Sequence, residues 1–382
     1  MPPAPKGQSE TGDPLLLTPG PLTTSKSVKL AMLHDWGSRD AAFLKLNREV
    51  LEWLPEIVCA KGKYAAVPMQ GSGTFAVEAM LTTFVPPKGK CLVLVNGAYG
   101  LRAKKILDIA KRQSVVYQTT EDTPPDIAEI ERMLDADSSI THIFAVHCET
   151  TSGIRNPIEA IARLERGRAV DVLVDAMSSF GALELDAPLL RIKAVAASSN
   201  KCIEGVPGLG FVICDPMALD ACAGNATTLV LDLHDQWITN TKTGQYRFTP
   251  PIHVIAAFHQ ALTEFRAENG VAGRGARYAK NTRVLIDGMR ELGFETLLPD
   301  DLQAPIIVTF HMPKDPAFGF QAFYDKLKER GYVIYPGKLT VADSFRIGCI
   351  GRLNEQHVRD VVANVREVLE EMRVKRGMRE QG

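Results

Sequence analysis

Short, continuously apolar runs alternate with longer helical patterns between about residue 70 and residue 215. The helical patterns are rich in good helix formers, as in LRAKKILDIAKR at 101–112 and IEAIARLERG at 158–167. This alternation predicts βαβ units around a mostly parallel sheet, whose continuously apolar strands are typical of a sheet covered by helices on both faces. The predicted strands are LVLV at 92–95, HIFAVH at 142–147, VLVD at 172–175, AVAAS at 194–198 and FVIC at 211–214.

The last third of the chain has a different pattern. Residues 252–295 are mainly helical, with a glycine-containing break at 269–275, and the remainder predicts a second, smaller α+β unit. We therefore expect three parts, namely a flexible tail at 1–14, a large domain with an amino-terminal segment at 15–265, and a small carboxyl-terminal domain at 266–382. The runs behind the smaller unit are APIIVTF at 304–310, a helix around 319–330, YVIYP at 332–336, FRIGCIG at 345–351 and a charged helix at 354–377.

Charge and cysteine usage narrow the class of protein. The 382 residues include 44 Lys and Arg against 45 Asp and Glu, and the net charge of −1 gives no electrostatic reason to expect nucleic acid or a membrane as partner. No apolar run reaches the ~20 residues of a spanning helix, and the start of the chain lacks the apolar stretch of a secretory signal. The seven cysteines form no C-x-x-C pair and show no zinc spacing with histidine, so we expect buried reduced thiols, no metal site and a cytoplasmic location.

A glycine-rich turn is the first candidate for chemistry. Gln70-Gly-Ser-Gly-Thr74 precedes the helical pattern FAVEAMLTTF. Such a turn at a helix start offers free backbone N–H groups, hydroxyls and the positive end of a dipole, which suit a phosphate. The turn matches neither the Walker A nor the GxGxxG pattern, and an ordinary helix cap is the alternative interpretation.

A carboxylate and a lysine follow two neighbouring predicted strands. Asp175 ends VLVD, and Lys201 comes shortly after AVAAS, 201 − 175 = 26 residues later, which leaves room for one crossover connection. Because ligands of open parallel sheets bind beyond the carboxyl ends of the strands, both side chains are placed at one candidate site. There Lys201 is a candidate Schiff-base nucleophile. The alternatives are a helix cap for Asp175 and a solvated surface position for Lys201.

An arginine inside an apolar strand of the smaller unit completes the set. Arg346 stands in FRIGCIG, and a buried arginine requires an anion, either a substrate carboxylate or an internal ion-pair partner. We predict pyridoxal 5′-phosphate as cofactor from the combination of the phosphate cradle, the lysine, the carboxylate and the arginine. This cofactor needs an anion site for its phosphate, a lysine for its aldehyde and an Asp for its pyridine nitrogen.

These motifs resemble those of the class V aminotransferases, which have the type I fold of pyridoxal-phosphate enzymes. The resemblance runs from about residue 15 to 372, and it is most specific in NKCIEGVPGLGFVI at 200–213. More narrowly, the chain is similar to members that move the amino group of 2-aminoethylphosphonate to pyruvate in phosphonate catabolism. The other segments that carry the resemblance are LLLTPGPLTTS at 15–25, NGAYGLR at 96–102, HCETTSGI at 147–154 and RFTPPIHV at 247–254.

The resemblance implies a fold and a set of roles. The fold is a mostly parallel seven-stranded sheet in a large domain plus a small α+β domain. Lys201 and Asp175 are the implied catalytic residues, and Arg346 is implied to bind the substrate carboxylate. The implied cofactor-binding residues are Ser72, Gly73, Thr74, Tyr99, Thr150, Asp175, Asn200, Lys201 and Thr249.

Two residues extend these expectations to a partner subunit and to the substrate. Thr249 matches a residue that reaches the phosphate in the neighbouring subunit, which implies a homodimer with shared sites. Arg39 matches no family role and is a candidate for the phosphonate dianion, with a surface or interface ion pair as the alternative. Three other functions stay open, namely another class V transaminase such as an alanine– or serine–glyoxylate aminotransferase, a cysteine desulfurase, and a non-catalytic binding protein.

Overall fold

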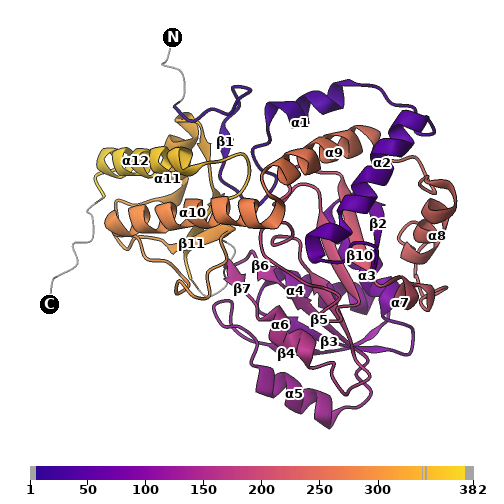
Figure 1. Ribbon diagram of the computed structural model, residues 1–382. Coiled ribbons are helices and arrows are strands. Elements are labelled where there is room, and N and C mark those ends of the chain that lie inside the picture. The colour runs from indigo at the N-terminus through magenta and orange to yellow at the C-terminus, as the bar shows by residue number, and fades with distance from the viewer. Residues whose placement is uncertain (1–5, 338, 340–341, 375–382) are drawn as a thin grey trace.

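The computed structural model describes residues 6–337, 339 and 342–374. Its centre is a seven-stranded sheet with helices on both faces (Figure 1). The strand order is β2-β10-β9-β8-β5-β3-β4, and within this sheet β10 alone runs antiparallel to its neighbours. The prediction of a mostly parallel seven-stranded sheet is therefore confirmed. The strands are β2 (Ala65–Gln70), β3 (Lys90–Val95), β4 (Gln113–Gln118), β5 (His142–Val146), β8 (Asp171–Asp175), β9 (Ala194–Ser198) and β10 (Leu209–Cys214).

Alternate residues of the buried strands enter two separate cores. In β8, Val172 and Val174 pack on one face and Leu173 packs on the other. Since side chains alternate along a strand, a strand covered on both faces must be apolar at every position, which explains the continuous runs in the sequence. The helices on the first face are α2 (Ala41–Trp53), α5 (Ile127–Ala136), α6 (Ile158–Arg163) and α9 (Ile252–Ala267), and those on the second are α3 (Gly73–Phe84), α4 (Ala98–Ile109), α7 (Pro216–Asp220) and α8 (Leu233–Thr243).

The carboxyl-terminal unit is built on a three-stranded antiparallel sheet in the order β11-β14-β13. A core of its own lies between this sheet and three helices (Figure 1). The elements are α10 (Gly270–Glu291), β11 (Ile307–His311), α11 (Phe320–Glu329), β12 (Tyr332–Val333), β13 (Tyr335–Pro336), β14 (Ser344–Gly348) and α12 (Glu355–Glu371). The helix expected over 354–377 ends earlier, at Glu371, and Arg373 already has a left-handed φ of 57°. Residues 375–377 of that prediction lie outside the described residues.

The amino-terminal segment connects the two units. β1 (Leu15–Leu16) pairs in parallel with β12, and Leu15 and Leu17 pack in the carboxyl-terminal core. The segment then passes through α1 (Lys26–Leu30) and the 3₁₀ turn η1 (Ala31–Leu33) to α2. The domain bounds 15–265 and 266–382 remain a prediction. Of the predicted tail, residues 1–5 lie outside the described residues, and the N–H of Gly7 donates to the carbonyl of Arg330.

Short elements complete the chain between the larger ones. They are the 3₁₀ turn η2 (Pro55–Val58) and the hairpin of β6 (Cys148–Glu149) with β7 (Ile154–Arg155). No helix within the described ranges is long and apolar enough to cross a lipid bilayer.

Candidate active site

A cavity of about 450 Å³ lies at the carboxyl ends of β8 and β9. Asp175 is the last residue of β8, and Lys201 lies in the turn that follows β9. β2 leads into the same cavity through Gly71, which precedes α3. The cavity brings together eight of the nine predicted cofactor-binding residues, namely Ser72, Gly73, Thr74, Tyr99, Thr150, Asp175, Asn200 and Lys201.

The start of α3 lines one side of this cavity. Ser72 occupies the cap position, but its side chain makes no capping hydrogen bond, so the N–H groups of Gly73 and Thr74 keep their donors for a ligand. A Cβ on Gly73 would lie 2.2 Å from the Sδ of Met177, so any other residue would force the Met177 side chain to move. The hydroxyl of Ser198, which also lines the cavity, is buried without a hydrogen-bond partner among the described residues. Ser198 was not predicted, because no local pattern distinguishes a hydroxyl at the end of a buried strand.

Asp175 is a buried carboxylate at the floor of the cavity. Burial raises its pKa to about 6, although the N–H of Met177 donates to Oδ1 over 2.8 Å and opposes that shift. The nearby Glu149 carboxylate raises the pKa of Asp175 further. A buried carboxylate in this state gains most from a cationic partner, and a protonated ring nitrogen supplies one.

Lys201 reaches across to the amino-terminal segment. Its Nζ donates to the carbonyl of Pro19 over 2.6 Å. Gly20 has φ +113° and a Cβ there would lie 2.8 Å from the Cδ of Lys201, so the close approach requires glycine. The family motif at 15–25 therefore has a physical reason, since this segment forms the wall beside the lysine.

Tyr99 and Arg102 form another side of the cavity. The guanidinium of Arg102 lies 4.9 Å from the centre of the Tyr99 ring, and its Nη1 donates to Oγ1 of Thr74 over 3.1 Å. The buried carboxylate of Glu149 accepts from the N–H of Tyr99 over 3.2 Å and from the hydroxyl of Thr151 over 2.6 Å. Arg102 and Glu149 were not predicted as site residues, although both lie within the family motifs.

Arg346 lies in β14 of the smaller unit and is 1% exposed. Its Nη1 donates to the carbonyl of Thr150 over 2.8 Å, and its Nε donates to the carbonyl of Pro336 over 3.2 Å. Burial lowers the pKa of Arg346, while Tyr99 and Tyr335 oppose the shift. The nearby Glu149 carboxylate also opposes the shift, but the described hydrogen bonds of Arg346 go to carbonyls and none of its described contacts is an ion pair with a carboxylate.

Two predicted residues lie outside this cavity. Arg39 is exposed just before α2. Thr249 is exposed as well, and its carbonyl accepts a hydrogen bond from Nε2 of Gln70 at the end of β2. One chain by itself thus does not bring either side chain to the site, and their roles remain predictions.

Comparison with known proteins assigns the family. The model of the aminotransferase class-V family matches residues 48–341, so the chain belongs to the class V aminotransferases. Among its relatives, the 2-aminoethylphosphonate–pyruvate transaminase of Pseudomonas fluorescens is 50% identical, with 95% of this chain and 98% of the relative covered. The enzyme of the same name from Rhizobium meliloti is 53% identical, with 95% of each covered.

Solved structures agree on the fold. The pyridoxamine–pyruvate aminotransferase of Mesorhizobium loti superposes with a TM-score of 0.86 at 23% identity, covering 96% of this chain and 95% of that one. The ureidoglycine–glyoxylate aminotransferase of Bacillus subtilis gives 0.87 at 21% identity, with 96% and 95% covered. Both are similar to this chain in fold.

Class V aminotransferases use pyridoxal phosphate, and the residues present fit it. The free donors at the start of α3 and the unpartnered hydroxyl of Ser198 suit the phosphate. Asp175 is a buried carboxylate that a ring cation would compensate, and Lys201, whose amine is of the kind that binds an aldehyde, lies in the same cavity. Among the described residues no cluster of His, Cys, Asp or Glu could hold a metal ion.

Proposed function

We propose that this chain transfers the amino group of 2-aminoethylphosphonate to pyruvate, giving phosphonoacetaldehyde and L-alanine. The observation that best supports this proposal is that the cavity containing Lys201 and Asp175 adjoins the buried, cationic Arg346. It occurs in a chain about 50% identical, over nearly its whole length, to transaminases named for these substrates. The site thus provides for a cofactor and for an anionic substrate at once.

The cofactor is held at its two ends by different parts of the sheet edge. Ser72, Gly73 and Thr74, together with Ser198 and Asn200, bind the phosphate, and Asp175 pairs with the protonated ring nitrogen. When bound, pyridoxal phosphate supplies an electron-accepting ring that acidifies the C–H next to the substrate nitrogen. Burial of Asp175 keeps water from competing for its charge, so the ring nitrogen stays protonated.

Lys201 has two tasks in succession. Its Nζ would hold the cofactor through the aldehyde until the amine of the substrate takes that place. As a free amine, Nζ would be the base that takes the proton from the substrate carbon and holds it for return. The carbonyl of Pro19, 2.6 Å from Nζ, orients the amine while it carries that proton.

Arg346 selects the acceptor. Its guanidinium is buried and held in place by two carbonyls, so its charge is available to the carboxylate of pyruvate. The carbonyl of Thr150 joins Arg346 to the cavity wall. The hydroxyl of Thr150 would contact the oxygen side of the ring. Binding at Arg346 therefore places the acceptor against the cofactor.

The proposal includes a homodimer with shared sites. Exposed large apolar side chains stand next to site residues in sequence, namely Phe75 beside Thr74, Leu101 beside Arg102 and Phe248 beside Thr249. Large apolar side chains exposed beside site residues favour coverage by a second subunit, which would bring its own Thr249 to the phosphate. In the same arrangement Arg39 is the candidate for the phosphonate.

A cytoplasmic location completes the proposal. All seven cysteines are free thiols, and all but Cys59 are buried. Thiols that remain unpaired are typical of a reducing compartment.

A panel of amino donors and acceptors tests the substrate assignment. We expect the kcat/KM for 2-aminoethylphosphonate with pyruvate to exceed that for alanine or serine with glyoxylate by about 100-fold or more. Lys201→Ala is expected to abolish turnover while the fold is retained. The control variant Lys193→Ala removes an ion pair with Asp215 and is expected to retain turnover. A higher kcat/KM for a glyoxylate pair would replace the proposed reaction with that of another class V transaminase.

A further inference from the structure

The turn that carries Lys201 is closed by Glu204. The N–H of Glu204 donates to the carbonyl of Lys201 over 2.8 Å, and the N–H of Gly205 donates to the carbonyl of Ser199 over the same distance. Glu204 has φ +65°, a left-handed conformation that a residue with a side chain rarely adopts. Such a conformation persists only where the surroundings determine it.

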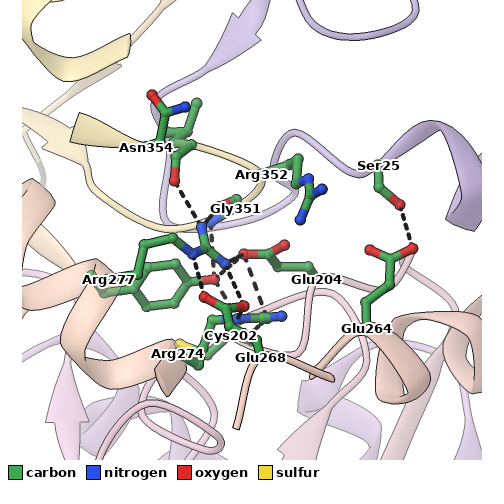
Figure 2. A network of polar contacts seen from close by, with 12 residues as sticks. Ser25, Cys202, Glu204, Glu264, Glu268, Arg274, Arg277, Gly351, Arg352 and Asn354 are labelled. Atoms are coloured by element: carbon green, nitrogen blue, oxygen red, sulfur yellow. Dashed lines mark hydrogen bonds and ion pairs between the residues drawn. The ribbon is translucent and has the colours of Figure 1, made fainter. Parts of the chain in front are cut away.

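The surroundings that determine this turn are side chains of α10. The carboxylate of Glu204 is 2% exposed, and its Oε1 accepts from Nη2 of Arg277 over 2.7 Å and from the hydroxyl of Tyr278 over 2.5 Å. The guanidinium of Arg274 donates to the carbonyl of Cys202, the residue after Lys201. Figure 2 shows these groups converging on the turn from one helix. Both the backbone and the side chain of the turn are thus fixed.

The same side chains hold the segment that follows β14. Nη1 of Arg277 donates to the carbonyls of Gly351 and Leu353, each over 2.7 Å, and the N–H of Gly351 donates to the hydroxyl of Tyr278 over 3.1 Å (Figure 2). Gly351 lies only 351 − 346 = 5 residues after Arg346. Arg277 and Tyr278 therefore join the Lys201 turn to the part of the chain that carries the acceptor-binding arginine.

The network also contains a carboxylate that does not touch the turn. Glu268 pairs with both arginines, through Nε of Arg274 at 2.7 Å and Nε of Arg277 at 2.5 Å. With Glu204 the two carboxylates balance the two guanidinium charges. A buried ion-pair network of this kind is weak evidence for stability, and its better attested effect is to specify one arrangement.

We infer that Glu204 is a positioning residue for Lys201, which fixes the lysine-bearing turn against Arg277 and Tyr278 and thereby sets the place of Nζ relative to Arg346. The inference rests on the proposed role of Lys201 as the cofactor-binding lysine. It adds a residue that touches neither cofactor nor substrate. Its effect is on geometry, because a displacement of about 1 Å at a reacting group can cost about 100-fold in rate.

Three variants of the cofactor-loaded protein test this inference. Glu204→Gly removes both the carboxylate and the backbone strain, and Glu204→Gln keeps the size and one acceptor oxygen. Glu268→Gln is the matched control, because it withdraws a carboxylate from the same two arginines and leaves the turn untouched. The measurement is the pH titration of the absorption band of the lysine-bound cofactor, accompanied by urea unfolding of each variant.

We expect both Glu204 variants to shift the titration midpoint by about half a pH unit or more, with the larger shift in Glu204→Gly. We also expect a fall in kcat of about 10-fold or more, with the KM for pyruvate little changed. Glu268→Gln is expected to lower the unfolding midpoint and to keep the wild-type titration.

Two results would overturn the inference. One is a wild-type midpoint in Glu204→Gly, and the other is a shift in all three variants that follows their loss of stability. The proposed function fails in a different way, because the wild-type protein would then show no lysine-bound band, or no reaction of that band with an amino donor.

Discussion

Asp175→Asn in the cofactor-free protein separates the chemistry of the site from its stability. Asp175 is buried, and burial raises its pKa from the ordinary 3.8 to about 6. An asparagine of nearly the same shape retains an oxygen that can accept the N–H of Met177. The substitution therefore removes a buried charge and leaves the hydrogen bond.

The expected gain follows from the raised pKa. The carboxyl of Asp175 binds its proton more tightly in the folded chain than in the unfolded chain. Below about pH 4 the carboxyl is protonated in both states and does not lower the free energy of unfolding. As the pH rises from 3.8 to 6, its ionisation lowers that free energy progressively. The two pKa values, 3.8 and about 6, differ by about 2.2, and a difference of one in pKa corresponds to about 1.4 kcal/mol. The charge of Asp175 therefore costs about 3 kcal/mol of folding stability at a pH well above 6. We therefore expect the free energy of unfolding of Asp175→Asn to exceed that of wild type by about 3 kcal/mol at pH 7.5, and by roughly half as much at pH 5.

Urea unfolding of both proteins, at one protein concentration and at several pH values, measures this difference. Bound cofactor is expected to abolish or reverse the advantage, because the ring nitrogen then compensates the charge of Asp175. The reasoning is refuted if the variant is no more stable than wild type at pH 7.5, or if its advantage does not change between pH 5 and pH 7.5.

Three further substitutions test the other parts of the site. Ser198→Ala removes the buried, unpartnered hydroxyl of the cavity and is expected to weaken cofactor binding about 10-fold, measured by the cofactor retained after dialysis. Gly73→Ala places a Cβ 2.2 Å from Met177 and is expected to lose the cofactor more completely, whereas a cofactor affinity like that of wild type would remove the start of α3 from the phosphate site. Arg346→Gln is expected to raise the KM for pyruvate about 10-fold or more with little loss of bound cofactor, and unchanged pyruvate kinetics would exclude it from acceptor binding.

The central strands of the sheet could be predicted closely from the sequence, and the two edge strands could not. AVAAS at 194–198 coincides with β9, because every position of that strand is buried and apolar. β2 and β4 were not predicted. β4 is an edge strand with glutamines at both ends and half-buried residues between, and β2 contains Pro68, so neither has the continuous apolar pattern.

The helical break at 269–275 was predicted too long, since α10 begins at Gly270 directly after the left-handed Asn269. Gly273 and Gly275 lie inside α10, because packing of this helix against the rest of the protein stabilises it. A Cβ on Gly275 would lie 2.5 Å from the carbonyl of Ala182. Tertiary packing here overrides the low helix propensity of glycine.

The candidate site divides in the same way. Residues at the ends of strands or the start of a helix, such as Asp175 and Ser72, could be placed from their local pattern. Glu204 could not, because its partners Arg277 and Tyr278 lie more than 70 residues away and on another unit. Arg39 and Thr249 are exposed in a single chain, and the roles predicted for them depend on the proposed second subunit.

Lys201, Asp175 and Arg346 are proposed to serve amino transfer from 2-aminoethylphosphonate. A single-turnover experiment tests it most directly, in which cofactor-loaded protein is mixed with 2-aminoethylphosphonate in the absence of pyruvate. The account predicts that the absorption band of the lysine-bound cofactor disappears, that one equivalent of phosphonoacetaldehyde forms per site, and that added pyruvate restores the band. A band that persists with 2-aminoethylphosphonate but disappears with serine or alanine would contradict the account.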